Sequence, residues 1–313
     1  MLVQELELNC VFAVASKPEG IDVNWVELDP RMLPQSLEVA PEFSQIVIPN
    51  DCDPARITRF IRTSGTTGAP KLIALSRGMV PKRLFAHYIV CEGAGSNRHL
   101  LSMPPGTIAG YGFLLMALLR GATVTPWLNG DDFDALIDRF HISHLLLAPI
   151  AFHDIVISNA RKGCSFSSVC CTTTGGAPFE SQLANKARSV LGPNIWNGYT
   201  STEAGFIARG HLNLLDTDPN IIGKILPFVN LQIVDEQDNP VPVGETGIVK
   251  IATELAVDHY VNSTDEDGVF RNGYIYPGDL GAVDDKGYLK ILGRADGLIN
   301  VRGLKAMPEN IEH

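Results

Sequence analysis

The chain has little that would bind nucleic acid. It contains 25 basic residues against 35 acidic ones, for a formal charge of −10, and no cluster of lysine and arginine with interleaved aromatic residues occurs. A nucleic-acid partner would need such a basic patch to neutralise backbone phosphates. The sequence therefore predicts no nucleic-acid partner.

Paired cysteines and long apolar runs are also missing. The six cysteines form no C-x-x-C pair and no spacing with histidine that is typical of zinc, and Cys170 and Cys171 lie side by side in an apolar run. No run of about 18 apolar residues occurs, and Met1–Lys17 carries Glu5 and Glu7 ahead of its short apolar stretch, unlike a signal peptide. These absences predict reduced, buried thiols, no membrane span and a cytoplasmic location.

The most informative stretch that is present is a polar loop, Arg62–Lys71, with the sequence R-T-S-G-T-T-G-A-P-K. It lies between two strand-like runs, Ala55–Ile61 and Leu72–Ser76. Its glycines allow backbone N–H groups to converge on one anion, its hydroxyls add donors, and its lysine adds a point charge. The spacing differs from a Walker A loop, and no obvious helix follows. A polar hairpin turn is the less favoured alternative. We expect a phosphate-binding loop for a nucleoside triphosphate, formed by Thr63, Ser64, Gly65, Thr66, Thr67, Gly68 and Lys71.

Downstream of this loop, strand-like and helix-like segments alternate. The expected strands are His99–Met103, Ala122–Trp127, His144–Pro149, Ser167–Thr174 and Asn194–Tyr199, and the expected helices are Gly112–Leu119, Asp131–Phe140, Ala151–Arg161 and Pro178–Leu191. Short apolar strands separated by helices predict an α/β fold with a largely parallel, layered sheet. Ligands of such sheets bind at the carboxyl ends of strands. Two strand ends, Thr172–Pro178 and Asn197–Glu203, are therefore candidate binding segments.

The pattern changes near Thr217. Strand-like runs with turn sequences between them then follow, at Leu231–Asp235, Gly247–Thr253 and Tyr288–Gly293. This pattern predicts an antiparallel, barrel-like subdomain. We expect an α/β core over 1–217 and a β-rich subdomain over 218–295. The first fifty residues hold one candidate strand, Gln45–Pro49.

Five segments, in this order, resemble the motifs of the adenylate-forming superfamily, which includes acyl- and aryl-CoA synthetases, adenylation domains of peptide synthetases and luciferases. They are Thr63–Lys71, Gly175–Pro178, Asn197–Glu203, Tyr276–Gly281 and Gly293–Asp296. The likeness runs from about Ile57 to Glu312. It implies the large N-terminal domain of the adenylate-forming fold, with residues 296–313 as the hinge and the stub of a small C-terminal domain.

The resemblance implies roles for individual residues. Asp279 would accept the ribose hydroxyls, Arg294 would bridge ribose and phosphate, Thr202 would contact the α-phosphate, and Glu203 would bind Mg²⁺ as a hard oxygen ligand. Thr66, Thr67 and Lys71 would act with Thr202 and Glu203 in the transfer. The adenine site would comprise Gly175, Gly176, Ala177, Pro178, Asn197, Gly198 and Tyr199, with the tyrosine ring as a flat face. Each of these residues also has a purely structural alternative. Tyr199 could be a core residue and Glu203 a solvated side chain. Asp279 could belong to a turn, and Arg294 could form a surface ion pair.

The implied reaction has two steps. A carboxylate attacks the α-phosphate of ATP to give an acyl-adenylate and pyrophosphate, and a thiol of coenzyme A or of a carrier-protein pantetheine then displaces AMP. The stretch Pro104–Leu115 has no acidic residue to hold an α-amino group, which favours an aryl or fatty acyl substrate. Tyr111 either lines the acid pocket or belongs to the core, while Gly175, Ser201 and Gly205 would leave room for a bulky group.

The sequence departs from the family at both ends. It stops at His313, before the lysine-bearing C-terminal domain of the family, and 62 residues precede Thr63. We therefore expect a truncated core. Three functions remain open: an acid–CoA ligase core, an adenylation domain that loads a carrier protein, and a nucleotide- or acyl-binding module without catalysis.

Overall fold

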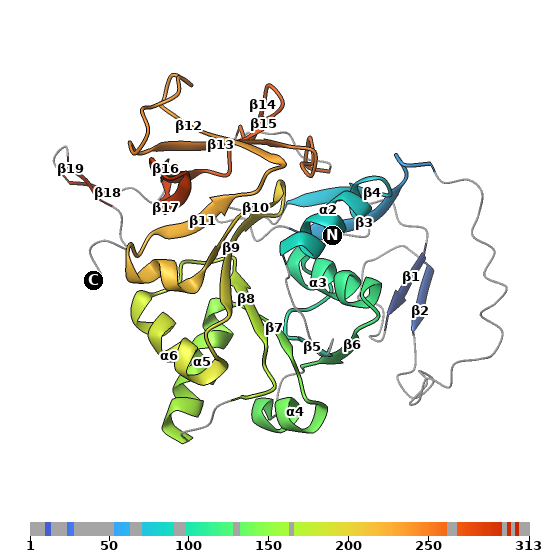
Figure 1. The fold of residues 1–313 in the computed structure, drawn as a ribbon. Helices are drawn as coiled ribbons and strands as arrows, with labels where there is room; N and C mark the ends of the chain where they lie inside the picture. The colour runs from blue at the N-terminus through green and yellow to red at the C-terminus, as the bar shows by residue number, and fades with distance from the viewer. Residues whose placement is uncertain are drawn as a thin grey trace. The chain divides into compact units, whose positions relative to one another are not determined.

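The computed structural model describes the backbone of residues 10–13, 24–27, 53–62, 71–90, 98–127, 132–162, 166–261, 268–295, 299–301 and 304–306, and, of their side chains, those of 53–62, 71–90, 98–127, 132–156, 166–261 and 268–295. The chain forms two compact units, Met1–Cys52 and Asp53–His313 (Figure 1). In the first unit, β1 (Cys10–Ala13) and β2 (Asn24–Glu27) pair in parallel, and neither strand was predicted. The predicted strand Gln45–Pro49 lies outside the described residues.

The second unit contains the predicted parallel strands and helices. The strands β6 (Thr123–Pro126), β5 (Arg98–Leu101), β7 (His144–Leu147), β8 (Cys171–Gly175) and β9 (Ile195–Ser201) pair in this order, all parallel. The connecting helices are α3 (Ile108–Leu119), α4 (Phe133–Phe140), α5 (Pro149–Lys162) and α6 (Ser181–Leu191). The alternation predicted from the sequence is therefore confirmed. Bounds differ at some ends: α3 starts at Ile108, because Thr107 caps it by accepting a hydrogen bond from the N–H of Gly110 at 3.0 Å.

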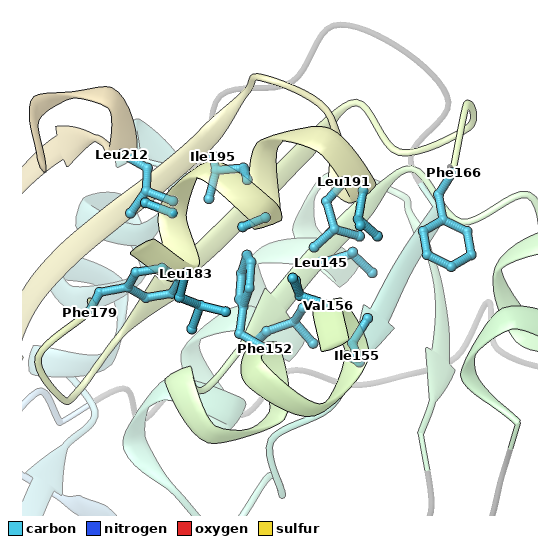
Figure 2. Packing of buried hydrophobic residues seen from close by; sticks show 14 of the residues in the cluster. Leu145, Phe152, Ile155, Val156, Phe166, Phe179, Leu183, Leu191, Ile195 and Leu212 are labelled. Carbon is cyan, nitrogen blue, oxygen red and sulfur yellow. The ribbon is translucent and has the colours of Figure 1, made fainter. Parts of the chain in front are cut away.

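Both faces of the central strands β7 and β8 are buried, as parallel strands require. Leu145 and Leu147 point into one apolar cluster, which α4, α5 and α6 cover; Figure 2 shows Phe152 of α5 among Leu145, Leu183 and Ile195. Leu146, between the two leucines, belongs to a second cluster with Phe113 of α3. Successive side chains of a strand point to opposite faces, so the run of leucines in β7 fills both cores at once.

Antiparallel strands extend the same sheet beyond β9. The strand β10 (Gly205–His211) pairs antiparallel with β9, and a 3-10 helix, Leu212–Asp216, follows it. Beyond β10 the sheet continues through β11 (Ile221–Ile225), β17 (Tyr288–Arg294), β16 (Asp279–Val283), β13 (Gly247–Thr253), β15 (Tyr274–Ile275) and β14 (Phe270–Arg271), while β12 (Val229–Val234) pairs with β13. This sheet has 13 strands among the described residues. Of these antiparallel strands, β12, β13 and β17 were predicted, whereas β10, β11, β14, β15 and β16 were not. The division into domains at 217, 295 and 313 stays a prediction.

A hairpin and a helix complete the unit. The strands β3 (Ile57–Arg62) and β4 (Leu72–Ser76) pair antiparallel around the predicted phosphate loop. The strand β4 comes directly after the loop, as expected. The helix α2 (Met79–Val90), which follows β4, was not predicted. Its apolar pattern is weak, because Phe85 and Tyr88 are exposed while Arg83 is buried. In the last residues, β18 (Ile299–Val301) pairs with β19 (Leu304–Ala306).

Each helix in the described part of the chain is too short or too polar to span a membrane.

Candidate active site

The carboxyl ends of β8 and β9 lie side by side, as predicted for a ligand site. Gly175 pairs with Gly198, and a Cβ atom at residue 175 would come within 2.5 Å of the Gly198 carbonyl oxygen. The two strands can meet this closely only because residue 175 is glycine. Gly176 follows with a φ of +88°, and Gly176, Ala177 and Pro178 are exposed beside the strand end.

Three of the predicted nucleotide residues come together across the sheet. The Tyr199 hydroxyl on β9 donates a hydrogen bond to Oδ2 of Asp279 on β16. Arg294, which pairs with Asp279 across β16 and β17, places Nη1 3.5 Å from Oδ1 of the same carboxylate and also donates to the Pro277 carbonyl. Burial, followed by the charge of Asp279, raises the pKa of Tyr199 well above its usual value, so the phenol remains a donor.

The turn that follows β9 carries Thr202 and Glu203, and neighbouring segments hold its backbone. The Glu203 carbonyl oxygen accepts hydrogen bonds from the N–H of Val257 at 2.9 Å and from Nη2 of Arg83 at 2.7 Å. The Thr202 carbonyl oxygen accepts from Nη1 of Arg83 at 2.9 Å. The Ser201 hydroxyl accepts from the N–H of Ala204 at 2.9 Å, which tightens the turn between β9 and β10.

One tyrosine connects the predicted metal ligand with the predicted phosphate loop. The Tyr260 hydroxyl donates to Oε1 of Glu203 at 2.8 Å, and Nζ of Lys71 lies 4.7 Å from the centre of the Tyr260 ring. The structure therefore brings Lys71 and Glu203 to the same aromatic side chain, although they lie far apart in the sequence. Sequence reasoning missed both Tyr260 and Arg83. A basic residue within an apolar helix is the only signal that could have indicated Arg83.

Six of the seven predicted phosphate-loop residues lie outside the described residues. They are Thr63, Ser64, Gly65, Thr66, Thr67 and Gly68, whereas the structure describes Lys71. Asn197 is buried on β9, next to Gly198. The roles assigned to all these residues stay predictions.

The donor set at Glu203 fits a magnesium ion that arrives with a nucleotide. No group of three His, Cys, Asp or Glu side chains that could hold a metal occurs among the described residues. Mg²⁺ usually keeps several waters and binds through one or two carboxylates together with substrate phosphates. A single carboxylate, Glu203, is enough for that mode of binding.

An apolar cavity of about 30 Å³ lies beside this turn, between α2, α3 and β10. Tyr111, His87 and Gly205 line it, as does the buried guanidinium of Arg83. Burial, with a smaller effect of the Arg83 charge, lowers the pKa of His87 to about 4, so the imidazole is neutral at physiological pH. The structure thus places Tyr111 and Gly205 on one cavity, next to Thr202 and Glu203.

Comparisons with known proteins agree with this geometry. The model of a family described as AMP-binding enzyme matches residues 5–261. The mitochondrial acyl-coenzyme A synthetase ACSM4 of Rattus norvegicus is 28% identical over 274 residues, which cover 80% of this chain and 45% of that protein. This chain thus spans about half the length of the curated relatives it matches. The predicted cytoplasmic location stays a prediction.

Solved structures share the fold. O-succinylbenzoate coenzyme A synthetase (MenE) of Bacillus subtilis, in complex with ATP and magnesium ion, aligns with a TM-score of 0.80 at 19% identity, over 99% of this chain and 64% of that chain. The same enzyme in complex with its acyl-adenylate intermediate aligns with a TM-score of 0.72 at 23% identity, over 81% and 52% of the two chains. The predicted fold, that of the large N-terminal domain of adenylate-forming enzymes, is confirmed.

Proposed function

Because the chain belongs to the AMP-binding enzyme family, we propose that it binds ATP with Mg²⁺ and activates a carboxylic acid as an acyl-adenylate. The observation that carries this proposal is the order of groups along β9 and its turn. Tyr199 lies beside Asp279, which also lies against Arg294. Glu203, a few residues later, binds Tyr260, whose ring also contacts Lys71. ATP has the same order, from adenine through ribose to the phosphates.

The nucleoside end would bind at the first of these groups. The Tyr199 ring offers a face for adenine, opposite the glycines at 175 and 176. Adenine and ribose are adjacent in ATP, so a residue that stacks on adenine must neighbour the residue that binds ribose. The hydrogen bond between Tyr199 and Asp279 meets this requirement. Arg294, beside Asp279, balances its charge and can reach toward the first phosphate.

The phosphate end would bind at the second group. Lys71 supplies a positive charge for the phosphates, and the hydroxyls of Thr66, Thr67 and Thr202 supply donors. Glu203 would hold Mg²⁺, which neutralises phosphate charge when it is bound. In the first step, a carboxylate oxygen of the acid bonds to the α-phosphorus while the bond to the bridging oxygen breaks, and pyrophosphate leaves with the electron pair. The chain contributes preorganised positive charge, and it aligns the carboxylate of the acid with the α-phosphate of ATP.

The acid would enter the apolar cavity beside Thr202. Its lining is mostly aliphatic and aromatic, which suits an aryl or fatty acyl group better than an amino acid. A cavity of about 30 Å³ holds roughly two waters. Entry of an acyl group therefore requires the lining side chains, His87 among them, to move.

We assign the second step to coenzyme A in the whole protein. Its thiolate would attack the acyl carbonyl, and AMP would leave as the bond between carbonyl carbon and phosphate oxygen breaks. The name of the rat relative, an acyl-coenzyme A synthetase, supports this acceptor over a carrier-protein pantetheine.

Exchange of label between pyrophosphate and ATP tests the first step. The chain is incubated with ATP, Mg²⁺ and pools of aryl, short-chain or long-chain carboxylic acids, with an acid-free reaction as control. Exchange that depends on one pool confirms adenylation, and subdividing that pool identifies the acid. ATP binding without exchange for any pool would show that these residues form either the nucleotide-binding half of a larger enzyme or a module that does not activate acids.

A further inference from the structure

Arg83 is a buried cation without an evident role in packing. Its side chain lies on α2 with 6% of its surface exposed, in a helix whose other buried residues are apolar. Burial lowers its pKa to about 10, so it remains protonated at neutral pH. Burying a guanidinium is unfavourable, and an apolar residue of similar size would stabilise such a helix at least as well. Its function must therefore lie in what it binds.

All of its hydrogen bonds go to two segments, the turn that carries Thr202 and Glu203 and the segment that follows β13. Nε donates to the Leu255 carbonyl at 2.8 Å, Nη1 to Thr202 at 2.9 Å and Nη2 to Glu203 at 2.7 Å. The planar guanidinium fixes the relative positions of the three carbonyls, because its donors have a rigid geometry. Arg83 thus joins the turn after β9 to the segment after β13.

That second segment also holds the side chain of Glu203. It contains Val257, whose N–H donates to the Glu203 carbonyl, and Tyr260, whose hydroxyl donates to Oε1 of Glu203. The Tyr260 ring is buried and packs edge-to-face on Phe270, with ring centres 5.0 Å apart. Glu203 is therefore fixed through both its backbone and one carboxylate oxygen.

We propose that Arg83 and Tyr260 are positioning residues that hold Glu203 in place to bind the Mg²⁺ of ATP. The proposal rests on the proposed function. With Oε1 bound to Tyr260, Oε2 would be the carboxylate oxygen left to bind the metal. A side chain held this way loses little conformational entropy when the metal binds, and its carboxylate stays in the position that binds the metal. The same Tyr260 ring contacts Lys71, so one residue aligns the metal ligand with the lysine of the phosphate loop.

The variant Tyr260→Phe tests the proposal, because it keeps the ring and its contacts with Lys71 and Phe270 and removes only the hydroxyl. ATP affinity is measured by calorimetry with Mg²⁺ and with EDTA, and the ratio of the two affinities is the readout. We expect this ratio to fall about tenfold in Tyr260→Phe, the size of one hydrogen bond to a charged group. Affinity in EDTA should stay unchanged, and the melting temperature should fall only slightly, because one hydrogen bond to a carboxylate is lost. The matched control is Tyr274→Phe, whose ring lies against Lys250.

A double variant separates positioning from a general structural effect. In a Glu203→Gln background the metal ligand is already lost, so adding Tyr260→Phe should not change the ratio further. The proposal would be overturned if Tyr260→Phe lowered the affinity ratio by the same factor in the wild type and in Glu203→Gln. Arg83→Lys keeps the charge but cannot bind the three carbonyls in one plane. It should therefore also lower the ratio of ATP affinity with Mg²⁺ to that with EDTA. Should Arg83→Lys fail to fold, Tyr260→Phe still decides.

The outcomes also distinguish this proposal from the proposed function. A wild-type chain that binds no ATP would overturn both. A wild-type chain whose ATP affinity rises with Mg²⁺, together with a Tyr260→Phe variant of unchanged ratio, would overturn the positioning role alone.

Discussion

Asp279 is the residue on which the nucleoside site depends most. Its carboxylate accepts from Tyr199 and lies against Arg294, and its side chain is 14% exposed. Its replacement also affects the fold, because the same carboxylate joins β9, β16 and β17 inside the protein.

The variant Asp279→Asn tests the ribose assignment with the least disturbance. An amide keeps an acceptor for the Tyr199 hydroxyl but loses the charge that binds two ribose hydroxyls and pairs with Arg294. We expect ATP affinity to fall about tenfold while the melting temperature drops only slightly. Calorimetry and thermal unfolding measure the two effects. The control Asp216→Asn removes a carboxylate that binds Arg188 outside the site, and it should leave ATP affinity unchanged. Equal affinity in Asp279→Asn and the wild type would contradict the ribose role.

At the scale of elements, local pattern predicted most of what the structure shows. The strands β5 to β9 and the helices between them follow from short apolar runs, capping residues such as Asp132, and glycine after helices. The helix α2 was missed because Arg83 interrupts its apolar face and Phe85 and Tyr88 are exposed. Strand β10 was missed because glycines begin and interrupt it, at Gly205 and Gly210, and its pairing with β9 comes from tertiary structure.

Of the candidate site, only the residues that lie in a recognisable sequence motif could be predicted. The sequence indicated Tyr199, Glu203 and Asp279, but it gave no sign of which residues hold them. Arg83 and Tyr260 act through contacts between segments that are distant in the chain, and no local pattern encodes such contacts. Hydrogen bonds to backbone carbonyls, as Arg83 makes, do not even depend on the identity of the partner residue.

The packing of α2 on α3 depends on Gly112, which lines the apolar cavity. A Cβ atom at residue 112 would lie 2.3 Å from Nε2 of His87. We expect Gly112→Ala to cost about 1–3 kcal/mol of unfolding free energy through overpacking. Urea denaturation measures this cost. At Gly106 nothing lies within 4 Å of an added Cβ, so Gly106→Ala is the control and should change stability little.

Removing the His87 ring should relieve the strain. A double variant His87→Ala with Gly112→Ala should be less destabilised than the sum of the two single variants, since each change makes room for the other. Strict additivity would show that the two side chains do not meet in solution.

For the whole molecule, buried histidines make stability depend on pH. His99 on β5 and His144 on β7 stack with ring centres 4.5 Å apart inside the second unit. Burial, then the neighbouring His144 and Arg120, lowers the pKa of His99 to about 3, and burial with Arg120 also lowers the pKa of His144. Below pH 6.5, the ordinary value, the unfolded chain binds protons that the folded chain does not. Stability is therefore full above about pH 6.5 and falls as the pH decreases toward 3.

Urea midpoints measured from pH 8 to pH 5 test this dependence. The midpoint should fall with pH in the wild type and fall less steeply in His99→Leu, which removes one buried titrating group beside Phe113. His153→Gln, at an exposed position, should leave the slope unchanged. A wild-type midpoint that does not change over this range would contradict the buried, neutral state of the pair.

The chain spans about half the length of its curated relatives. We propose the thioester step for the whole protein only, and we propose ATP binding for this chain, because the residues assigned to the nucleotide all lie within it. We propose that two groups of residues form a single ATP site. Tyr199, Asp279 and Arg294 make up the first group, and Glu203, Tyr260 and Lys71 make up the second.

The most direct measurement is a calorimetric titration of the wild-type chain with ATP, with and without Mg²⁺, repeated with Tyr199→Ala and Glu203→Gln. Our account predicts saturable binding that Mg²⁺ strengthens, that Tyr199→Ala weakens under both conditions, and that loses its dependence on Mg²⁺ in Glu203→Gln. No binding of ATP by the wild-type chain, or binding that neither variant changes, would contradict it.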